Sequence, residues 1–272
     1  MSSKKTCKTL LKILTGKEYV LFTDRANTAI DLSFQVCAGR SHVLKQEDGG
    51  WMTYLPLAQK NGFEVTSMVT LDGSFSEKEL LHYGMDEILI VHSLAAYLTP
   101  LDMKSLYNRC ITQDIFLIND VSGSIGLDQA KYGDIVLGSF GKAKPVALGK
   151  GGFLATNNKE LFDTIVASYD EFEDLDFSAL ANLLESLQER REKIESIVSR
   201  VKQDLVTRCG ESRVLQPATS HSLVAIVRFD SDREKEDLIA YCDEQNLEYT
   251  VCPREIRILD DAISIEVKRL FP

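Results

Sequence analysis

Residues 115–158, IFLINDVSGSIGLDQAKYGDIVLGSFGKAKPVALGKGGFLATNN, contain two short apolar strands and the polar loops that follow them. The strand-like runs at 115–120 and 134–140 are rich in Ile, Leu, Val and Phe, as strands buried on both faces are. The first run ends in Asn119-Asp120, and the second leads into a loop of small residues with two lysines. In open α/β sheets, ligands bind beyond the carboxyl ends of the strands. The residues that follow these strands are therefore the first candidates for a functional site.

The alternation of strand and helix extends from this stretch toward the N-terminus. Helical patterns at 27–37, 51–60, 76–82 and 101–109 alternate with strand-like runs at 19–23, 42–45, 63–69 and 87–93. Strands joined by crossover helices form parallel sheets that are covered on both faces. We therefore expect an α/β fold with a mainly parallel sheet and helices on both faces.

The pattern changes after residue 159. Residues 180–206 predict one long, charged, amphipathic helix. A helical pattern at 232–245 and strand-like runs at 222–229, 248–251 and 263–268 follow it. We therefore expect a large domain with an N-terminal helix at 1–165, and a small α+β domain at 166–272 that begins with the long interdomain helix.

The composition is that of a chain long enough to bury a sizeable core, since 44% of its 272 residues are apolar and 26% are charged. Lys and Arg number 31 against 41 Asp and Glu, and the net charge of −10 argues against a nucleic-acid partner. No apolar run approaches the roughly 18 residues of a membrane span. Lys12 interrupts the apolar cluster at 10–14, so we expect a cytoplasmic protein whose N-terminus is an amphipathic helix and not a secretory signal. The helix would dock on the protein's own body or on a second subunit, with a role at a membrane surface as the alternative.

Metal and nucleotide motifs are missing from the sequence. The six cysteines form no Cys-x-x-Cys pair, and the four histidines lack metal-ligand spacing, so we expect reduced thiols and no metal. Gly149-Lys150 is followed by Gly151, where a P-loop needs Ser or Thr. Leu154 stands where the dinucleotide fingerprint needs its third glycine.

Three strand ends carry polar groups that could act together. Residues 24–28, Asp-Arg-Ala-Asn-Thr, open a helix whose free N–H groups suit an anion, although Asn27 or Thr28 could simply cap that helix. Asp120 would need a cation or a donor if buried, and could otherwise form a turn. Lys142 and Lys144 could be solvated charge. Together, the three groups match pyridoxal 5′-phosphate (PLP), whose phosphate, ring nitrogen and aldehyde need an anion site, a carboxylate and an amine.

Residues 20–160 resemble the large domain of fold-type I PLP-dependent enzymes, specifically the DegT/DnrJ/StrS-type sugar aminotransferases. The matching motifs are IFLIND ending at Asp120, GDIVLGSFGKAK ending at Lys144, and GKGG at 149–152, where the family has Gly-Glu-Gly-Gly. The resemblance implies that Lys144, rather than Lys142, holds PLP as an internal aldimine and later moves the α-proton. It also implies that Asp120 partners the ring nitrogen.

The resemblance implies further cofactor contacts. The turn at 26–28 and Ser139 would bind the phosphate, and Trp51 would stack on the pyridine ring, with core packing as the alternative for Trp51. His92 is interpreted as structural. The full set of implied cofactor-binding residues is Ala26, Asn27, Thr28, Trp51, Asp120, Ser122, Gly123 and Ser139.

The chain departs from the family pattern at three places. Gly123 stands where the family has Gln or His, and Lys150 reverses the charge of the family's Glu. The acidic stretch 170–176 replaces a segment that reaches the partner's site, and it would repel an anionic substrate unless it folds away. The chain is also shorter than a typical member.

The function implied by the resemblance is that of a homodimeric PLP-dependent aminotransferase with a small-molecule amino donor, glutamate or glutamine, and a keto acceptor. A nucleotide-linked keto sugar is the candidate acceptor. The alternatives are another PLP-dependent reaction on an amino acid, of the lyase or racemase type, and a non-catalytic PLP-fold protein with a binding or regulatory role.

Overall fold

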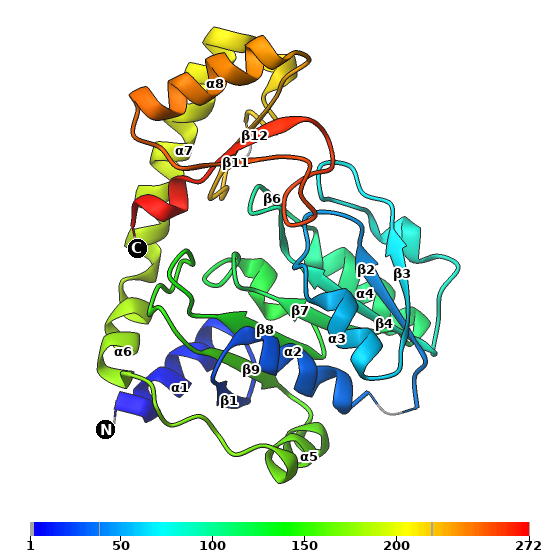
Figure 1. Cartoon of the computed structure of the whole chain (residues 1–272). Coiled ribbons are helices and arrows are strands. Elements are labelled where there is room, and N and C mark those ends of the chain that lie inside the picture. The colour runs from blue at the N-terminus through cyan, green and yellow to red at the C-terminus, as the bar shows by residue number, and fades with distance from the viewer. Residues whose placement is uncertain (1–2, 38, 219, 272) are drawn as a thin grey trace.

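A seven-stranded sheet forms the centre of the large domain (Figure 1). The computed structural model describes residues 3–37, 39–218 and 220–271, so the outermost residues of the two predicted domains lie outside the described ranges. The strands run in the order β1-β9-β8-β7-β4-β2-β3, and β9 alone is antiparallel to its two neighbours. The predicted mainly parallel sheet is therefore confirmed. The strands are β1 (Tyr19–Thr23), β2 (His42–Gln46), β3 (Glu64–Met68), β4 (Glu87–His92), β7 (Phe116–Asp120), β8 (Ile135–Ser139) and β9 (Gly152–Thr156).

Helices cover both faces of this sheet because consecutive strand residues point to opposite faces. Ile118 of β7 packs in a core with helices α2, α3 and α5, whereas its neighbour Leu117 packs in a second core with α4. A third core joins α1 and α6 to β1, β8 and β9. The helices are α1 (Ser3–Thr15), α2 (Ala26–Gln35), α3 (Tyr54–Lys60), α4 (Met103–Gln113), α5 (Lys159–Ser168) and α6 (Phe177–Glu185).

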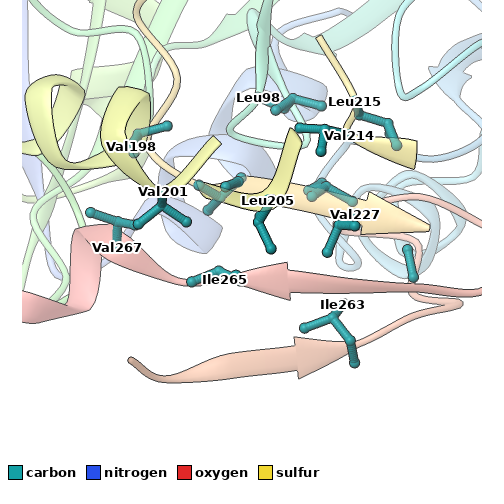
Figure 2. Packing of buried hydrophobic residues seen from close by; sticks show 14 of the residues in the cluster. Leu98, Val198, Val201, Leu205, Val214, Leu215, Val227, Ile263, Ile265 and Val267 are labelled. Carbon is teal, nitrogen blue, oxygen red and sulfur yellow. The ribbon is translucent and has the colours of Figure 1, made fainter. Parts of the chain in front are cut away.

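The small domain is an antiparallel sheet covered by two helices. Its strands β10 (Ala225–Arg228), β12 (Ala262–Ile265) and β11 (Tyr249–Val251) pair in that order. The helices α7 (Leu187–Cys209) and α8 (Asp232–Glu244) pack against this sheet, and Figure 2 shows Val201 and Leu205 of α7 facing Val227 and Ile265. A hairpin of the large domain, β5 (Leu94–Ala95) and β6 (Thr99–Pro100), also buries side chains in this core.

The prediction of one long helix over 180–206 is wrong. The structure has two helices, α6 and α7, that meet at Ser186. The Ser186 hydroxyl donates to the Asn182 carbonyl oxygen at 2.8 Å, a local side-chain bond that competes with continued helix geometry. The two helices also pack on different bodies, since α6 lies against α1 and α7 enters the small-domain core.

We expected the boundary between the domains at residues 165–166. The change from one hydrophobic core to the other lies further along the chain. Leu180, Leu184 and Leu187 belong to the core shared with α1, whereas Ile194 and the buried residues of α7 after it belong to the small-domain core. The change of core therefore falls within the first turns of α7. The domain limits themselves remain a prediction.

The N-terminal amphipathic helix docks on the body of the protein. In α1, Cys7, Leu11 and Thr15 are buried, and the helix packs mainly against α6. Lys4 and Lys8 pair with Glu171 at 2.6 and 2.7 Å. In the described ranges, no helix combines the length and the apolar character needed to cross a membrane.

Candidate active site

A cavity of about 430 Å³ lies where the carboxyl ends of the large-domain strands face the small domain. This volume is in the range of pockets that hold small molecules and cofactors. Residues from both domains line it: Arg25, Ala26, Asn27, Trp51, Tyr97, Ser122, Ser139, Gly141, Lys142, Ala143, Lys144, Ile256, Arg257, Lys268 and Arg269. The sequence-predicted residues Ala26, Asn27, Trp51, Ser122, Ser139 and Lys144 are therefore brought together.

Asp120 ends β7 next to this cavity and is buried. The Tyr54 hydroxyl donates to its Oδ2 at 2.9 Å, and the Ser122 backbone N–H donates to its Oδ1 at 2.9 Å. Burial and the charge of Asp120 raise the pKa of Tyr54 well above its usual value, so the phenol stays a donor. A carboxylate has about four lone-pair sites, which leaves Asp120 able to accept a further hydrogen bond.

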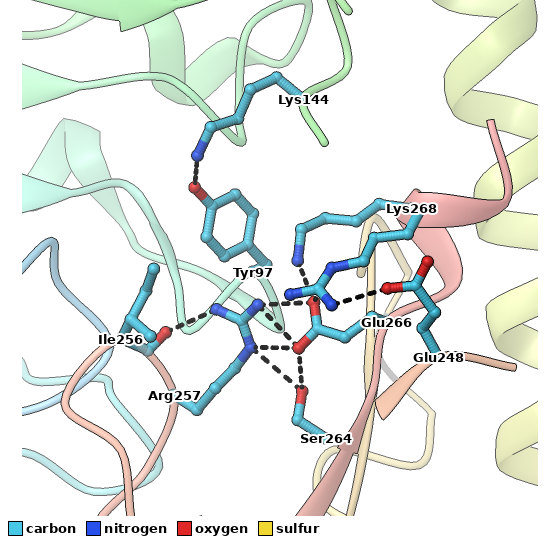
Figure 3. A network of polar contacts seen from close by, with 9 residues as sticks. Tyr97, Lys144, Glu248, Ile256, Arg257, Ser264, Glu266 and Lys268 are labelled. Atoms are coloured by element: carbon cyan, nitrogen blue, oxygen red, sulfur yellow. Dashed lines mark hydrogen bonds and ion pairs between the residues drawn. The ribbon is translucent and has the colours of Figure 1, made fainter. Parts of the chain in front are cut away.

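Lys144 is half-buried and reaches into the cavity, whereas Lys142 in the same loop is exposed. The Lys144 ammonium lies 5.3 Å from the centroid of the Trp51 ring and donates to the Tyr97 hydroxyl (Figure 3). Trp51 is held by its indole N–H, which donates to Asn27 Oδ1 at 2.9 Å. An aromatic face and an amine therefore stand side by side at the strand ends.

The charges of Lys144 and Asp120 both influence the buried side chain of His92. Burial, the largest cause, lowers the pKa of His92 to about 4. The charge of Asp120 opposes this shift, while the charges of Lys144 and Arg257 add to it. His92 also pairs with Asp120 in the register of β4 and β7.

The start of α2 forms one end of the cavity. Arg25 is the N-cap, and no side chain caps the helix, so the alternative that Asn27 or Thr28 is the cap is wrong. A Cβ on Gly152 would lie 2.8 Å from the Ala26 nitrogen, so glycine is needed for β9 to come this close. Uncapped N–H groups at a helix start suit a phosphate.

Three implied cofactor contacts lie outside the residues that line the cavity: Asp120, which is bonded to the lining residue Ser122, and also Thr28 and Gly123. The Thr28 hydroxyl donates to Asp24 Oδ1, which holds it against the preceding turn. Gly123 lies against side chains instead, since a Cβ there would be 3.0 Å from Tyr97 Cδ1 and 3.1 Å from His92 Cε1. The Gly123 carbonyl accepts from Arg191 at 2.7 Å.

The acidic stretch 170–176 folds away from the cavity. Besides the pairs that Glu171 forms with α1, Asp174 pairs with Lys150 at 2.8 Å and the Asp176 side chain caps α6. The reversed charge at Lys150 is therefore neutralised by the same stretch that had been expected to repel an anionic substrate.

Sequence reasoning missed the small-domain wall of the cavity. Arg257 forms two short contacts to the Glu266 carboxylate, at 2.6 and 2.8 Å, and Lys268 donates to the same carboxylate. All three side chains are buried. The one available cue was a charged residue inside an apolar run, at Glu266 in 262–268. Tyr97 had no cue, because the hairpin that carries it was not predicted.

Solved structures with a similar fold include a synthase and two aminotransferases. 3-Amino-5-hydroxybenzoic acid synthase superimposes with a TM-score of 0.77 at 14% identity, over 100% of this chain and 87% of that chain. PseC of Helicobacter pylori, an aminotransferase involved in the biosynthesis of pseudoaminic acid, gives 0.76 at 13% identity, over 98% and 86%. A DegT DnrJ EryC1 StrS aminotransferase from Brucella abortus gives 0.74 at 16% identity, over 98% and 85%. At these identities, the likeness shows the fold.

One segment of the sequence matches the model of a known protein family. Residues 83–170, about a third of the chain, match the model of the DegT/DnrJ/EryC1/StrS aminotransferase family. This segment contains Asp120, Ser139 and Lys144, and the match agrees with the resemblance to this aminotransferase family that the sequence motifs indicate. No curated protein matches the sequence.

Proposed function

We propose that the protein is a PLP-dependent aminotransferase that holds its cofactor on Lys144. One arrangement carries the proposal: an amine, an indole face and an uncapped helix start line one cavity, and a buried carboxylate with room for another donor is bonded to the lining residue Ser122. Each of these groups has a counterpart in the chemistry of PLP, and the cavity is large enough for it.

Each residue has a stated task in this proposal. PLP supplies an aldehyde that bonds an amine and a ring that accepts the electrons released at the substrate's α-carbon. Lys144 would hold the cofactor through its Nζ and, once a substrate amine has taken its place, would move the α-proton as a general base. Asp120 would keep the ring nitrogen protonated, and the Tyr54 hydroxyl and the Ser122 N–H orient the Asp120 carboxylate for this role. Asn27, Ser139 and the start of α2 would hold the phosphate.

The substrates in this proposal are a small-molecule amino donor, glutamate or glutamine, and a nucleotide-linked keto sugar as acceptor. The charge of the cavity supports anionic substrates. Among the described residues that line it, six are cationic and none is acidic, in a chain with more acids than bases. Clefts lined by one sign of charge attract ligands of the opposite sign. We also propose a cytoplasmic homodimer, and sedimentation at the mass of one chain would contradict the dimer.

Covalent capture of the cofactor tests the proposal. Purified protein is mixed with PLP, reduced with borohydride and digested, and the modified peptide is identified by mass. We expect the modification at Lys144, its loss in Lys144→Ala, and its retention in the matched control Lys142→Ala. Wild-type protein that takes up no PLP covalently would contradict the proposal.

Addition of an amino donor then identifies the reaction. An aminotransferase converts the bound cofactor to its amine form and releases a keto acid. Release of product without the amine form would favour a lyase or racemase instead. Two features point to that alternative: Gly123 in place of Gln or His, and the acidic stretch 170–176 in place of the segment that reaches the partner's site. A cofactor that is bound but never converted would favour a binding or regulatory role.

A further inference from the structure

Tyr97 sits at the tip of the β5–β6 hairpin in a backbone conformation that bulky residues rarely adopt. The φ angles of Ala96 and Tyr97 are 56° and 61°. The tip is held from both domains, because the Ala96 N–H donates to the Gly49 carbonyl at 2.9 Å and the Leu223 N–H donates to the Tyr97 carbonyl at 2.8 Å. A strained residue that the surroundings hold in place is a candidate for a functional role.

The Tyr97 ring is enclosed by side chains from both domains. It contacts His92, with ring centroids 4.5 Å apart, and it fills the space that the missing side chain of Gly123 leaves open. Arg257 Cζ and Lys268 Nζ lie 5.0 and 4.4 Å from the ring centroid. Tyr97 is 2% exposed, so these neighbours restrict the orientation of its ring.

The two cations beside the Tyr97 ring, Arg257 and Lys268, are themselves held by hydrogen bonds. Glu266 accepts three hydrogen bonds from Arg257 and another from Lys268, and the Ser264 hydroxyl donates to Glu266 at 3.1 Å (Figure 3). Side chains of the small domain therefore help to set the position of Tyr97, although Tyr97 itself belongs to a hairpin of the large domain.

The Tyr97 hydroxyl points to Lys144 and accepts a hydrogen bond from its Nζ (Figure 3). A lysine side chain has four rotatable bonds, and its free end samples many positions unless a partner fixes it. An oxygen on an immobile ring is such a partner. Small errors in the placement of a reacting atom reduce rates by about a hundredfold.

We propose that Tyr97 is the positioning residue for Lys144: its hydroxyl holds the amine beside Trp51 and links the amine's position to the small domain. The proposal rests on the proposed function for the use of that amine. The placement of the amine is a property of the cofactor-free protein and can be measured in it.

The variant Tyr97→Phe keeps the ring and removes the hydroxyl. The matched control is Tyr107→Phe, which removes a hydroxyl that donates to Asp134 at 3.2 Å and lies outside the cavity lining. The first measurement is the rate of covalent PLP capture at Lys144, followed by borohydride reduction and peptide mass. We expect capture to slow about tenfold or more in Tyr97→Phe and to keep the wild-type rate in Tyr107→Phe.

The second measurement needs no cofactor. Acetic anhydride labels lysines in the PLP-free protein, and labelling of Lys144 is compared with that of Lys142 in the same loop. We expect Tyr97→Phe to raise the Lys144 to Lys142 ratio several-fold, because the amine loses its partner, while Tyr107→Phe leaves the ratio unchanged. A purely structural role for Tyr97 predicts no change.

The outcomes separate the two proposals. Unchanged labelling in Tyr97→Phe, or wild-type capture by that variant, would overturn the role of Tyr97. If wild-type protein captures no PLP but the labelling ratio shifts as expected, the proposed function fails and the positioning of Lys144 by Tyr97 stands.

Discussion

His92 is a buried imidazole whose two ring nitrogens have no hydrogen-bond partner in the part of the chain that the structure describes. It packs against Tyr97 and lies beside Asp120. Burial is the main cause that lowers its pKa to about 4, so the ring is neutral in the folded protein at neutral pH. The interpretation of His92 as structural agrees with this environment, and it makes the residue a source of pH-dependent stability.

The sign of that dependence follows from proton binding. An unfolded histidine has a pKa of about 6.5, so between about pH 6.5 and 4 the unfolded chain binds a proton that the folded protein does not. The neutral, buried His92 therefore stabilises the folded protein above pH 6.5. As the pH falls toward 4, the free energy of unfolding decreases by about 3 kcal/mol in total. We expect His92→Leu, followed by urea unfolding at pH 7 and 4.5, to remove about 2 kcal/mol of the acid sensitivity.

The matched control is His82→Gln, at an exposed histidine. It should keep the wild-type difference between the two pH values. An unchanged difference in His92→Leu would show that other groups cause the acid sensitivity.

At the scale of elements, α1 and the acidic stretch 170–176 form one unit on the outside of the sheet. Lys4 contacts Glu171 and Glu173, and Lys8 contacts Glu171. Glu171 also accepts from the Phe22 backbone N–H at 3.1 Å. These charges hold the stretch against α1 and β1, away from the cationic cavity, although exposed ion pairs add little stability by themselves.

The apolar face of α1 is buried against the body of the protein. Leu11 is fully buried in the core shared with α6, whereas Ile13 on the same helix is 68% exposed. We expect Leu11→Ala to lower the free energy of unfolding by about 2–5 kcal/mol, because it leaves a cavity. Ile13→Ala should change it by about 0.5 kcal/mol or less. Denaturant unfolding of both variants measures the difference, and equal effects would mean that α1 does not depend on this face.

At the scale of the whole molecule, the distribution of charge differs from the net charge. The chain carries −10, yet cations face the cavity between the two domains. Behind that wall, Glu266 is almost completely buried. Burial opposes its ionisation, but Lys268 and Arg257 outweigh that effect and hold the pKa of Glu266 well below its usual range. Burial and the charge of Arg257 lower the pKa of Lys268.

Removal of this single negative charge should therefore destabilise the molecule. Glu266→Gln leaves two buried cations without a counter-ion, and we expect a loss of about 3–5 kcal/mol in the free energy of unfolding. The matched control Glu248→Gln removes a more exposed carboxylate that pairs with Arg269 at 2.8 Å, and should cost about 1 kcal/mol or less. Thermal or denaturant unfolding of the two variants measures both effects. A similar decrease in the free energy of unfolding in the two variants would contradict the expected role of Glu266.

The sequence by itself determined the large-domain layout and the central part of the candidate site. Strands such as 19–23 and 115–120 were predicted because their apolar runs and the polar residues after them are local features. The same holds for Asp120, Ser139 and Lys144, which lie within one short block that two adjacent strands carry to one edge. Strand β9 and helix α5 were not predicted, because short elements beside glycines and asparagines give a weak periodic pattern.

Only the tertiary structure decided what surrounds that block. Tyr97 meets Arg257 and Lys268 at the cavity although both are far from Tyr97 in the chain and no motif links them to it. The division of the long helix at Ser186 and the pairing of 170–176 with α1 depend in the same way on which bodies pack together. Local patterns encode whether a segment forms a strand or a helix and which face it buries. Contacts between distant segments depend on the path of the whole chain, so the positioning of Lys144 could be seen only once the two domains were placed together.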